Sequence, residues 1–109
     1  MKIKSFLLIL FIITIFTTNL SFADEAKIAK GLEIFNETAA CAACHMLKAA
    51  GSEGNIGPNL DTVEGLTEAS VMDIVTHGLG VMPAFGEDEI LTKEEIAIVS
   101  FYVANSVQK

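Results

Sequence analysis

Apolar residues recur at the spacing of an amphipathic helix in three stretches of the chain, residues 25–36, 67–77 and 92–108. The repeating positions are Ile28, Leu32 and Phe35 in the first, Val71, Ile74 and Val75 in the second, and Ile96, Val99 and Val103 in the third. Gly78 is a natural stop for the second stretch, and Thr92 with Glu95 forms a capping box at the start of the third. Beyond residue 23 no segment shows the alternation of a strand. The pattern therefore predicts an all-α fold.

The N-terminal residues have the layout of a secretory signal peptide. Two lysines near the start are followed by an apolar run over residues 6–16 and then by the small residues Ser21 and Ala23. An uncleaved membrane anchor is the alternative, but the apolar run is shorter than the roughly 20 residues that span a bilayer. We expect a signal peptide over residues 1–23 and one domain over residues 24–109. No second run of spanning length follows, so the exported domain is expected not to span a membrane.

Size and charge narrow the class of the exported domain. The chain of 109 residues carries 7 basic residues, all lysine, against 14 acidic ones, and its net charge is −7. Removal of the signal peptide takes two lysines away and leaves 86 residues with a formal charge of −9. The acidic balance argues against nucleic acid, which needs basic side chains to neutralise its phosphates. So small a domain also needs a staple such as a disulfide, a metal or a covalent cofactor.

The run C-A-A-C-H over residues 41–45 points to that staple. Two thiols two residues apart can each add across a porphyrin vinyl group, and a following histidine is then placed beneath the iron. A disulfide between Cys41 and Cys44 is the simplest alternative in an oxidising compartment. A redox-active C-x-x-C motif usually lies beside a βαβ unit, and the sequence after residue 23 predicts no strand. A structural zinc site would need His77 as its fourth ligand, and His77 lacks the paired spacing that is usual in such sites. The motif predicts one covalent haem c, attached through Cys41 and Cys44.

An iron held by His45 has a second axial position, for which the sequence offers few ligands. Met46 follows His45 directly and cannot reach the opposite face of the ring, while Met72 falls inside a predicted helix and suits a core position. Met82 lies in a loop with flanking glycines and a proline, and a thioether favours electron transfer. We predict His45 and Met82 as the metal ligands. His77 is the alternative, although its place before Gly78 fits a helix end.

The ordered motifs resemble those of the class I c-type cytochromes, which are soluble and hold one haem. The shared positions are Gly31 and Phe35, residues 41–45, the G-P-N-L of residues 57–60, the M-P-A-F of residues 82–85, and Tyr102. The resemblance implies a small helical fold wrapped around one covalently attached haem, with the N- and C-terminal helices crossing near Gly31. It also implies that the Pro58 carbonyl accepts a hydrogen bond from the non-ligating nitrogen of His45, so Pro58 joins the predicted cofactor-binding residues.

The same resemblance implies a one-electron carrier rather than an enzyme. We expect a periplasmic monomer, the thylakoid lumen being the less favoured compartment, whose partners are redox proteins with basic docking surfaces. Its donor would be a cytochrome bc complex or a dehydrogenase, and its acceptor a terminal oxidase or reductase. The acidic residues 87–89 follow the Met82 loop and form either a docking patch or a plain solvated loop.

Three other functions stay open at this point. The chain would be a dedicated haem subunit of a periplasmic oxidoreductase, although no long tail or exposed apolar segment marks it as one. It would be a ligand-binding or sensing module if Met82 gave way to a gas or peroxide. It would be a haem-free disulfide protein if it proved colourless.

Overall fold

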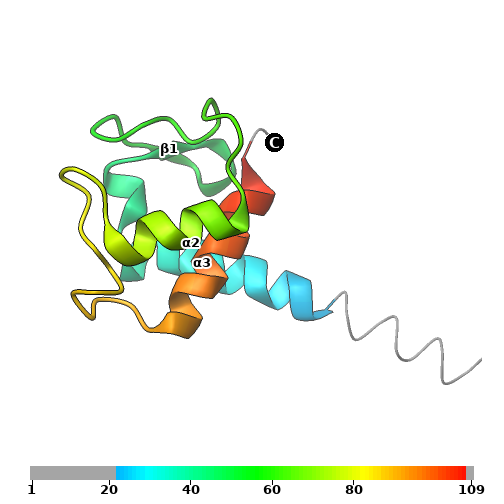
Figure 1. Cartoon of the computed structure of the whole chain (residues 1–109). Helices are drawn as coiled ribbons and strands as arrows, with labels where there is room; N and C mark the ends of the chain where they lie inside the picture. Colours follow the sequence, from blue (N-terminus) through cyan, green and yellow to red (C-terminus); the bar gives the residue numbers. More distant parts are fainter. Residues whose placement is uncertain (1–21, 108–109) are drawn as a thin grey trace, which may run out of the picture.

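The computed structural model describes residues 22–107 as a small helical fold (Figure 1). Residues 22–33 are α-helical and continue into a π-helical turn. The elements that follow in chain order are η1 (Ile34–Thr38), η2 (Cys41–Ala43), β1 (Met46–Leu47), η3 (Lys48–Ala50), β2 (Ser52–Glu53), α2 (Glu68–His77) and α3 (Lys93–Ser106). Residues 1–21 of the predicted signal peptide lie outside the described part, so that peptide stays a prediction.

The three helices occur where the apolar spacing predicts them. Thr92 caps α3 through the predicted box: its side chain accepts a hydrogen bond from the Glu95 backbone N–H, and the Glu95 carboxylate accepts one from the Thr92 N–H. Thr67 and Ser70 cap α2 in the same reciprocal way. Gly78 ends α2 as expected. Local side-chain chemistry therefore fixes where both long helices begin.

One short hairpin departs from the all-helical prediction. β1 and β2 pair antiparallel, Met46 with Glu53 and Leu47 with Ser52. The expectation of no strand was wrong here, because two residues per strand are too few to show an alternating pattern. The buried Ser52 hydroxyl holds the hairpin, since it accepts from the Leu47 N–H at 2.9 Å and donates to the His45 carbonyl at 2.9 Å. The hairpin thus fixes the main chain that leaves the C-A-A-C-H run.

The first and last helices cross at Gly31, as the resemblance implies. A Cβ atom at Gly31 would lie 2.2 Å from the Cβ of Tyr102, so no side chain fits between the helices. The Tyr102 ring packs edge-on against Phe35, with 6.0 Å between the ring centroids. In Figure 1 the cyan first helix passes behind the orange and red α3. The crossing brings both ends of the described chain into one core.

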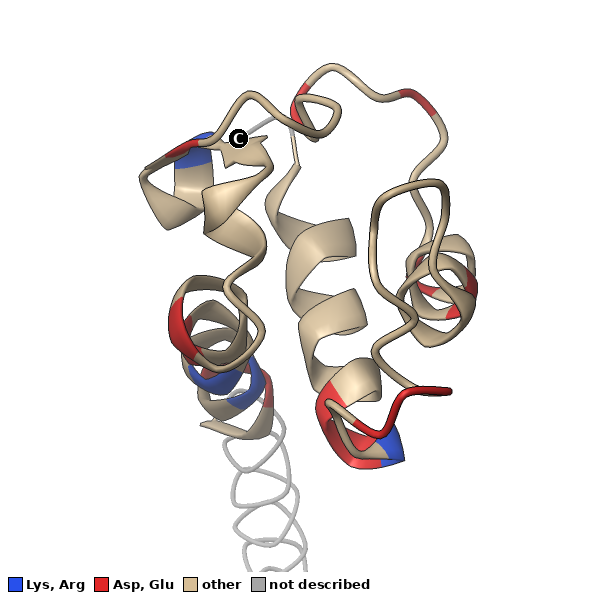
Figure 2. Ribbon diagram, turned by 90° about the vertical axis from the view of Figure 1, so that its left-hand side faces the viewer, with Lys and Arg blue, Asp and Glu red and all other residues tan. Residues whose placement is uncertain are grey.

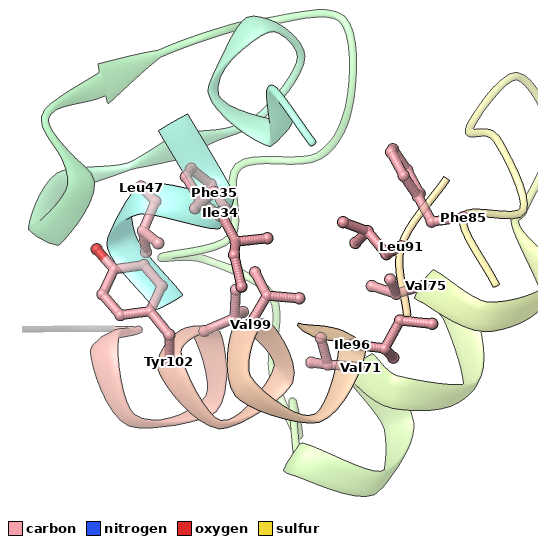
Figure 3. Close-up of a cluster of buried hydrophobic side chains, with 11 residues drawn as sticks. Ile34, Phe35, Leu47, Val71, Val75, Phe85, Leu91, Ile96, Val99 and Tyr102 are labelled. Atoms are coloured by element: carbon pink, nitrogen blue, oxygen red, sulfur yellow. The ribbon is translucent and has the colours of Figure 1, made fainter. Parts of the chain in front are cut away.

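The core divides into two groups of side chains above α3 (Figure 3). Phe35, Leu47 and Tyr102 lie on one side, whereas Val75 and Phe85 lie on the other. Val99 projects from α3 between them, and all of these side chains are buried. The separation leaves an opening between the two groups.

No helix within residues 22–107 is both long and apolar enough to cross a membrane.

Candidate cofactor site

A cavity of about 660 Å³ lies between the two halves of the core. Its walls come from the C-A-A-C-H run, from residues 56–66, from α2 and the loop after it, and from Val99 and Val103 of α3. All five predicted site residues line it: Cys41, Cys44, His45, Pro58 and Met82. Volumes of about 300–1,000 Å³ are usual for pockets that enclose a small molecule or cofactor. The fold therefore gathers into one cavity the five predicted site residues, which extend from Cys41 to Met82 in the sequence.

The two cysteines stand on a tight turn in the wall of the cavity. η2 starts after Ala40, whose φ of 51° lies in the left-handed region, and the Cys41 carbonyl accepts hydrogen bonds from the N–H groups of both Cys44 and His45. This turn brings both thiols and the imidazole to the same wall. Both cysteines are free and half-buried, and burial raises the pKa of the Cys41 thiol to about 11.

The His45 ring is held from one side and left free on the other. Its Nδ1 lies 2.8 Å from the Pro58 carbonyl oxygen, which is the contact that the resemblance implies. The Gly57 backbone lies against the ring, because a Cβ there would come within 2.6 Å of Cε1. No group of residues 22–107 hydrogen-bonds to Nε2. A hydrogen bond to one ring nitrogen fixes the tautomer and orientation that leave the other free to bind a metal.

Another segment of the cavity lining carries Met82 on a reverse turn. The N–H groups of Leu79 and Met82 each bond to the other's carbonyl, and Gly80 between them has a φ of 59°. Just beyond the turn, Phe85 N–H donates to the Val75 carbonyl at 2.9 Å, which ties the loop to α2. Met82 is half-buried and packs against the core. Local backbone bonds thus hold the segment that carries Met82.

The competing ligands lie elsewhere. The Met46 sulfur accepts a hydrogen bond from the Asn59 side chain at 3.2 Å, and Met72 packs against the core without lining the cavity. His77 ends α2 on the exposed surface, where its Nδ1 lies 2.6 Å from a Glu87 carboxylate oxygen. That hydrogen bond raises the pKa of His77. Within residues 22–107 no cluster of three or more His, Cys, Asp or Glu residues is arranged to hold a metal ion.

The mouth of the cavity is apolar and uncharged. Ile56, Leu79 and Val81 line the cavity yet are 70%, 71% and 91% exposed. None of the lining residues in the described chain is Asp, Glu or Lys. Figure 2 shows the red acidic positions spread over the ends and edges of the fold. The expectation of no exposed apolar segment, which argued against a dedicated subunit, was wrong at these three residues, because nothing in the local sequence tells an exposed apolar loop residue from a buried one.

The residues present fit a covalently attached haem. The cavity is lined almost entirely by apolar side chains, it holds two thiols that can form thioethers, and it offers a nitrogen and a sulfur donor from separate segments. Imidazole and thioether are both established iron ligands of haem proteins.

Comparison with known proteins agrees with this site. The family described as "Cytochrome C oxidase, cbb3-type, subunit III" matches residues 26–103. The chain belongs to this family of c-type cytochromes. The cofactor of the cytochrome is thus haem c, for which Cys41 and Cys44 supply the two thiols.

A solved structure supports the same family. The cytochrome is similar to the c-type cytochrome SorU from Sinorhizobium meliloti, with 45% sequence identity and a TM-score of 0.70. The match covers 78% of this chain and 95% of the SorU chain. No curated protein matches the cytochrome. The helical fold and the haem-based electron-transfer chemistry expected from the sequence are therefore confirmed.

Proposed function

We propose that this cytochrome is an exported one-electron carrier whose haem iron is bound by His45 on one face and Met82 on the other. The observation that carries the proposal is their shared cavity: both residues line it, and the two cysteines stand in the His45 wall. Bound haem supplies a couple between ferric and ferrous iron. The C-A-A-C-H run, the predicted signal peptide and the net charge of −7 fit an acidic carrier of the periplasm.

The contacts around His45 and Met82 would hold both side chains in position for a bound haem iron. His45 is oriented by the Pro58 carbonyl and by the Gly57 backbone. Met82 sits on a bonded turn that is anchored to α2. Two retained ligands leave no open position for oxygen or peroxide, so we expect electron transfer without catalysis.

The mouth of the cavity is where we expect partners to dock. Ile56, Leu79 and Val81 present exposed apolar side chains there. Complexes between redox proteins usually have small interfaces. The contact surface at the mouth is uncharged while the whole molecule is acidic, so we expect a partner surface with an apolar centre and basic residues around it. Of the acidic loop, Glu87 is engaged with His77, which leaves Asp88 and Glu89 to steer such a partner.

A dedicated subunit is the second candidate function. The matched family is described as a subunit of an oxidase, which favours a permanent partner. SorU is described simply as a c-type cytochrome, and the match covers 95% of its chain. Purification under native conditions separates the two functions: a free carrier elutes at its own mass, whereas a subunit elutes with its partner.

The first test of the ligands is an absorption spectrum of the protein exported from cells that mature c-type haem. We expect a sharp low-spin spectrum when reduced, a weak red sulfur-to-iron band when oxidised, and no change with carbon monoxide. A high-spin spectrum, or a change with carbon monoxide, would mean an open iron and would replace the carrier by a sensing or catalytic function.

A further inference from the structure

A pair of side chains beside His45 has no part in the site as described so far. The Asn59 amide nitrogen donates to the Met46 sulfur at 3.2 Å. Met46 directly follows His45, and Asn59 directly follows Pro58. The sulfur contact therefore stands next to the bond between the His45 ring and the Pro58 carbonyl, on the same two segments. From this juxtaposition we infer that Met46 and Asn59 are positioning residues that aim the Pro58 carbonyl at His45 and so tune the reduction potential.

Backbone bonds join the two segments on either side of the pair. Gly57 N–H donates to the Cys44 carbonyl at 2.8 Å, and Leu60 N–H donates to the Met46 carbonyl at 3.0 Å. These bonds fix the distance between the segments. Neither bond involves the carbonyl or the N–H of the peptide between Pro58 and Asn59, so the tilt of this peptide depends on other contacts. The bond of the Pro58 carbonyl to His45 and those of the Asn59 carbonyl to Thr62 are two of them.

Two hydrogen bonds of the Asn59 side chain, one at its amide oxygen and one at its amide nitrogen, restrain the tilt of this peptide. Its oxygen accepts from the Asp61 N–H at 3.0 Å, which closes a turn, while its nitrogen reaches across to the Met46 sulfur. Both side chains are half-buried, so water does not fully replace a lost contact. A thioether is a weak acceptor, and its effect on stability is correspondingly small. Its effect on the orientation of the Pro58 carbonyl is larger, because the hydrogen bond between that carbonyl and His45 weakens steeply as its angle departs from linear.

The direction of the expected change follows from the chemistry of the ligand. A well-aimed carbonyl makes the imidazole more basic, and a more basic ligand favours the more highly charged ferric iron. Loosening the Pro58 carbonyl therefore raises the potential. This inference rests on His45 as an iron ligand, which the absorption spectrum tests separately.

The experiment compares Met46→Leu with Met72→Leu in the haem-loaded protein. Both substitutions replace the sulfur with a carbon branch of similar volume, but of the two sulfur atoms only that of Met46 accepts a hydrogen bond. We expect Met46→Leu to raise the potential by about 18 mV, an about twofold change at 59 mV per tenfold, and Met72→Leu to leave it unchanged. The NMR signal of the His45 Nδ1 proton should shift upfield only in Met46→Leu.

Asn59→Ala and the double variant complete a cycle. If Asn59 acts through the sulfur, Met46→Leu adds nothing to the potential shift of Asn59→Ala. Equal potentials and equal Nδ1 proton shifts in Met46→Leu and the wild type would overturn the inference, as would additive shifts in the double variant. If His45 is not an iron ligand, the absorption spectrum of the wild type already departs from the expected low-spin form. Failure of the proposed function is thereby distinguished from failure of this inference.

Discussion

Gly31 and Tyr102 meet where the first and last helices cross, with 2.2 Å between the Tyr102 Cβ and the place that a Gly31 Cβ would occupy. Real Cβ atoms do not approach so closely, and the clash falls on the stem of the tyrosine rather than on a flexible tip. The crossing positions Phe35 and Val99, which line the cofactor cavity. The close approach of two helices is thus a condition for the shape of the site.

Gly31→Ala is expected to destabilise the haem-loaded protein by about 1–3 kcal/mol, the usual cost of overpacking a core. This stability is lost although alanine has a higher helix propensity than glycine. A denaturant titration measures it, and Ala29→Val on the exposed side of the same helix is the control. A variant as stable as the wild type would show that the helices can separate without cost.

Met82→Ala is expected to remove the weak red band of the oxidised protein and to let reduced iron bind carbon monoxide. Met82→His should keep the iron closed but lower the potential, because a thioether stabilises ferrous iron and imidazole does not. Met72→Leu is the control, since Met72 packs against the core outside the cavity. A red band that persists in Met82→Ala would assign the sulfur ligand to another methionine.

The pair of His77 and Glu87 predicts a stability that depends on pH. The Glu87 hydrogen bond raises the pKa of His77 above its ordinary value of 6.5. A raised pKa means that protonated His77 stabilises the folded state fully below pH 6.5, and that this stabilisation is lost as the pH rises through the folded value. The denaturation midpoint of the wild type should therefore fall over that interval.

His77→Gln should lack this fall, and Glu87→Gln should reduce it. Asp73 lies 3.6 Å from the other ring nitrogen and supports the same sign. Titration of the His77 ring by NMR gives the pKa directly. A midpoint difference between wild type and His77→Gln that is constant from pH 5 to 8 would contradict the prediction.

Val81→Lys is expected to slow electron exchange with a lysine-ringed mitochondrial cytochrome by about fivefold or more, as loss of a central contact does in other interfaces. The reason is that a charge at the mouth of the cavity must be desolvated on docking. Ile90→Lys is the control, because Ile90 is exposed but does not line the cavity. Equal rates for the two variants in stopped-flow mixing would move the docking surface away from the mouth.

Removal of the covalent cofactor should unfold the chain. Without haem, the apolar lining of the cavity of about 660 Å³ loses the group that covers it and meets water. A small domain has only about 5–15 kcal/mol of stability, so a loss of this kind is large for it. The double variant Cys41→Ser and Cys44→Ser should therefore melt without a cooperative transition in circular dichroism. A sharp transition like that of the loaded protein would show that the helices pack without haem.

The sequence was informative wherever local chemistry decides the structure. The capping box at Thr92, the stop at Gly78 and the spacing of the apolar residues follow from neighbours within one or two turns. The C-A-A-C-H run was recognisable because thioether attachment and iron binding need those residues at that spacing. Resemblance to a family added Gly31 and Pro58, whose partners Tyr102 and His45 lie far along the chain or across a loop.

Contacts that depend on tertiary structure were not predictable from the pattern. Ser52 is a polar residue that became buried because a two-residue hairpin uses its hydroxyl. The residues near Met46 in the sequence do not indicate that Asn59 is its hydrogen-bond donor. The exposure of Val81 follows from a turn whose bonds join Leu79 and Met82. In each case the deciding neighbour is set by how segments pack, which the local pattern does not record.

The half-buried position of Cys41 has a consequence for how the molecule is made. Only a thiolate attacks readily, and the pKa of about 11 in the folded chain leaves almost none at neutral pH. Folding before attachment would therefore lower the reactivity of this sulfur, and we expect thioether formation at Cys41 to be faster while the polypeptide is still open.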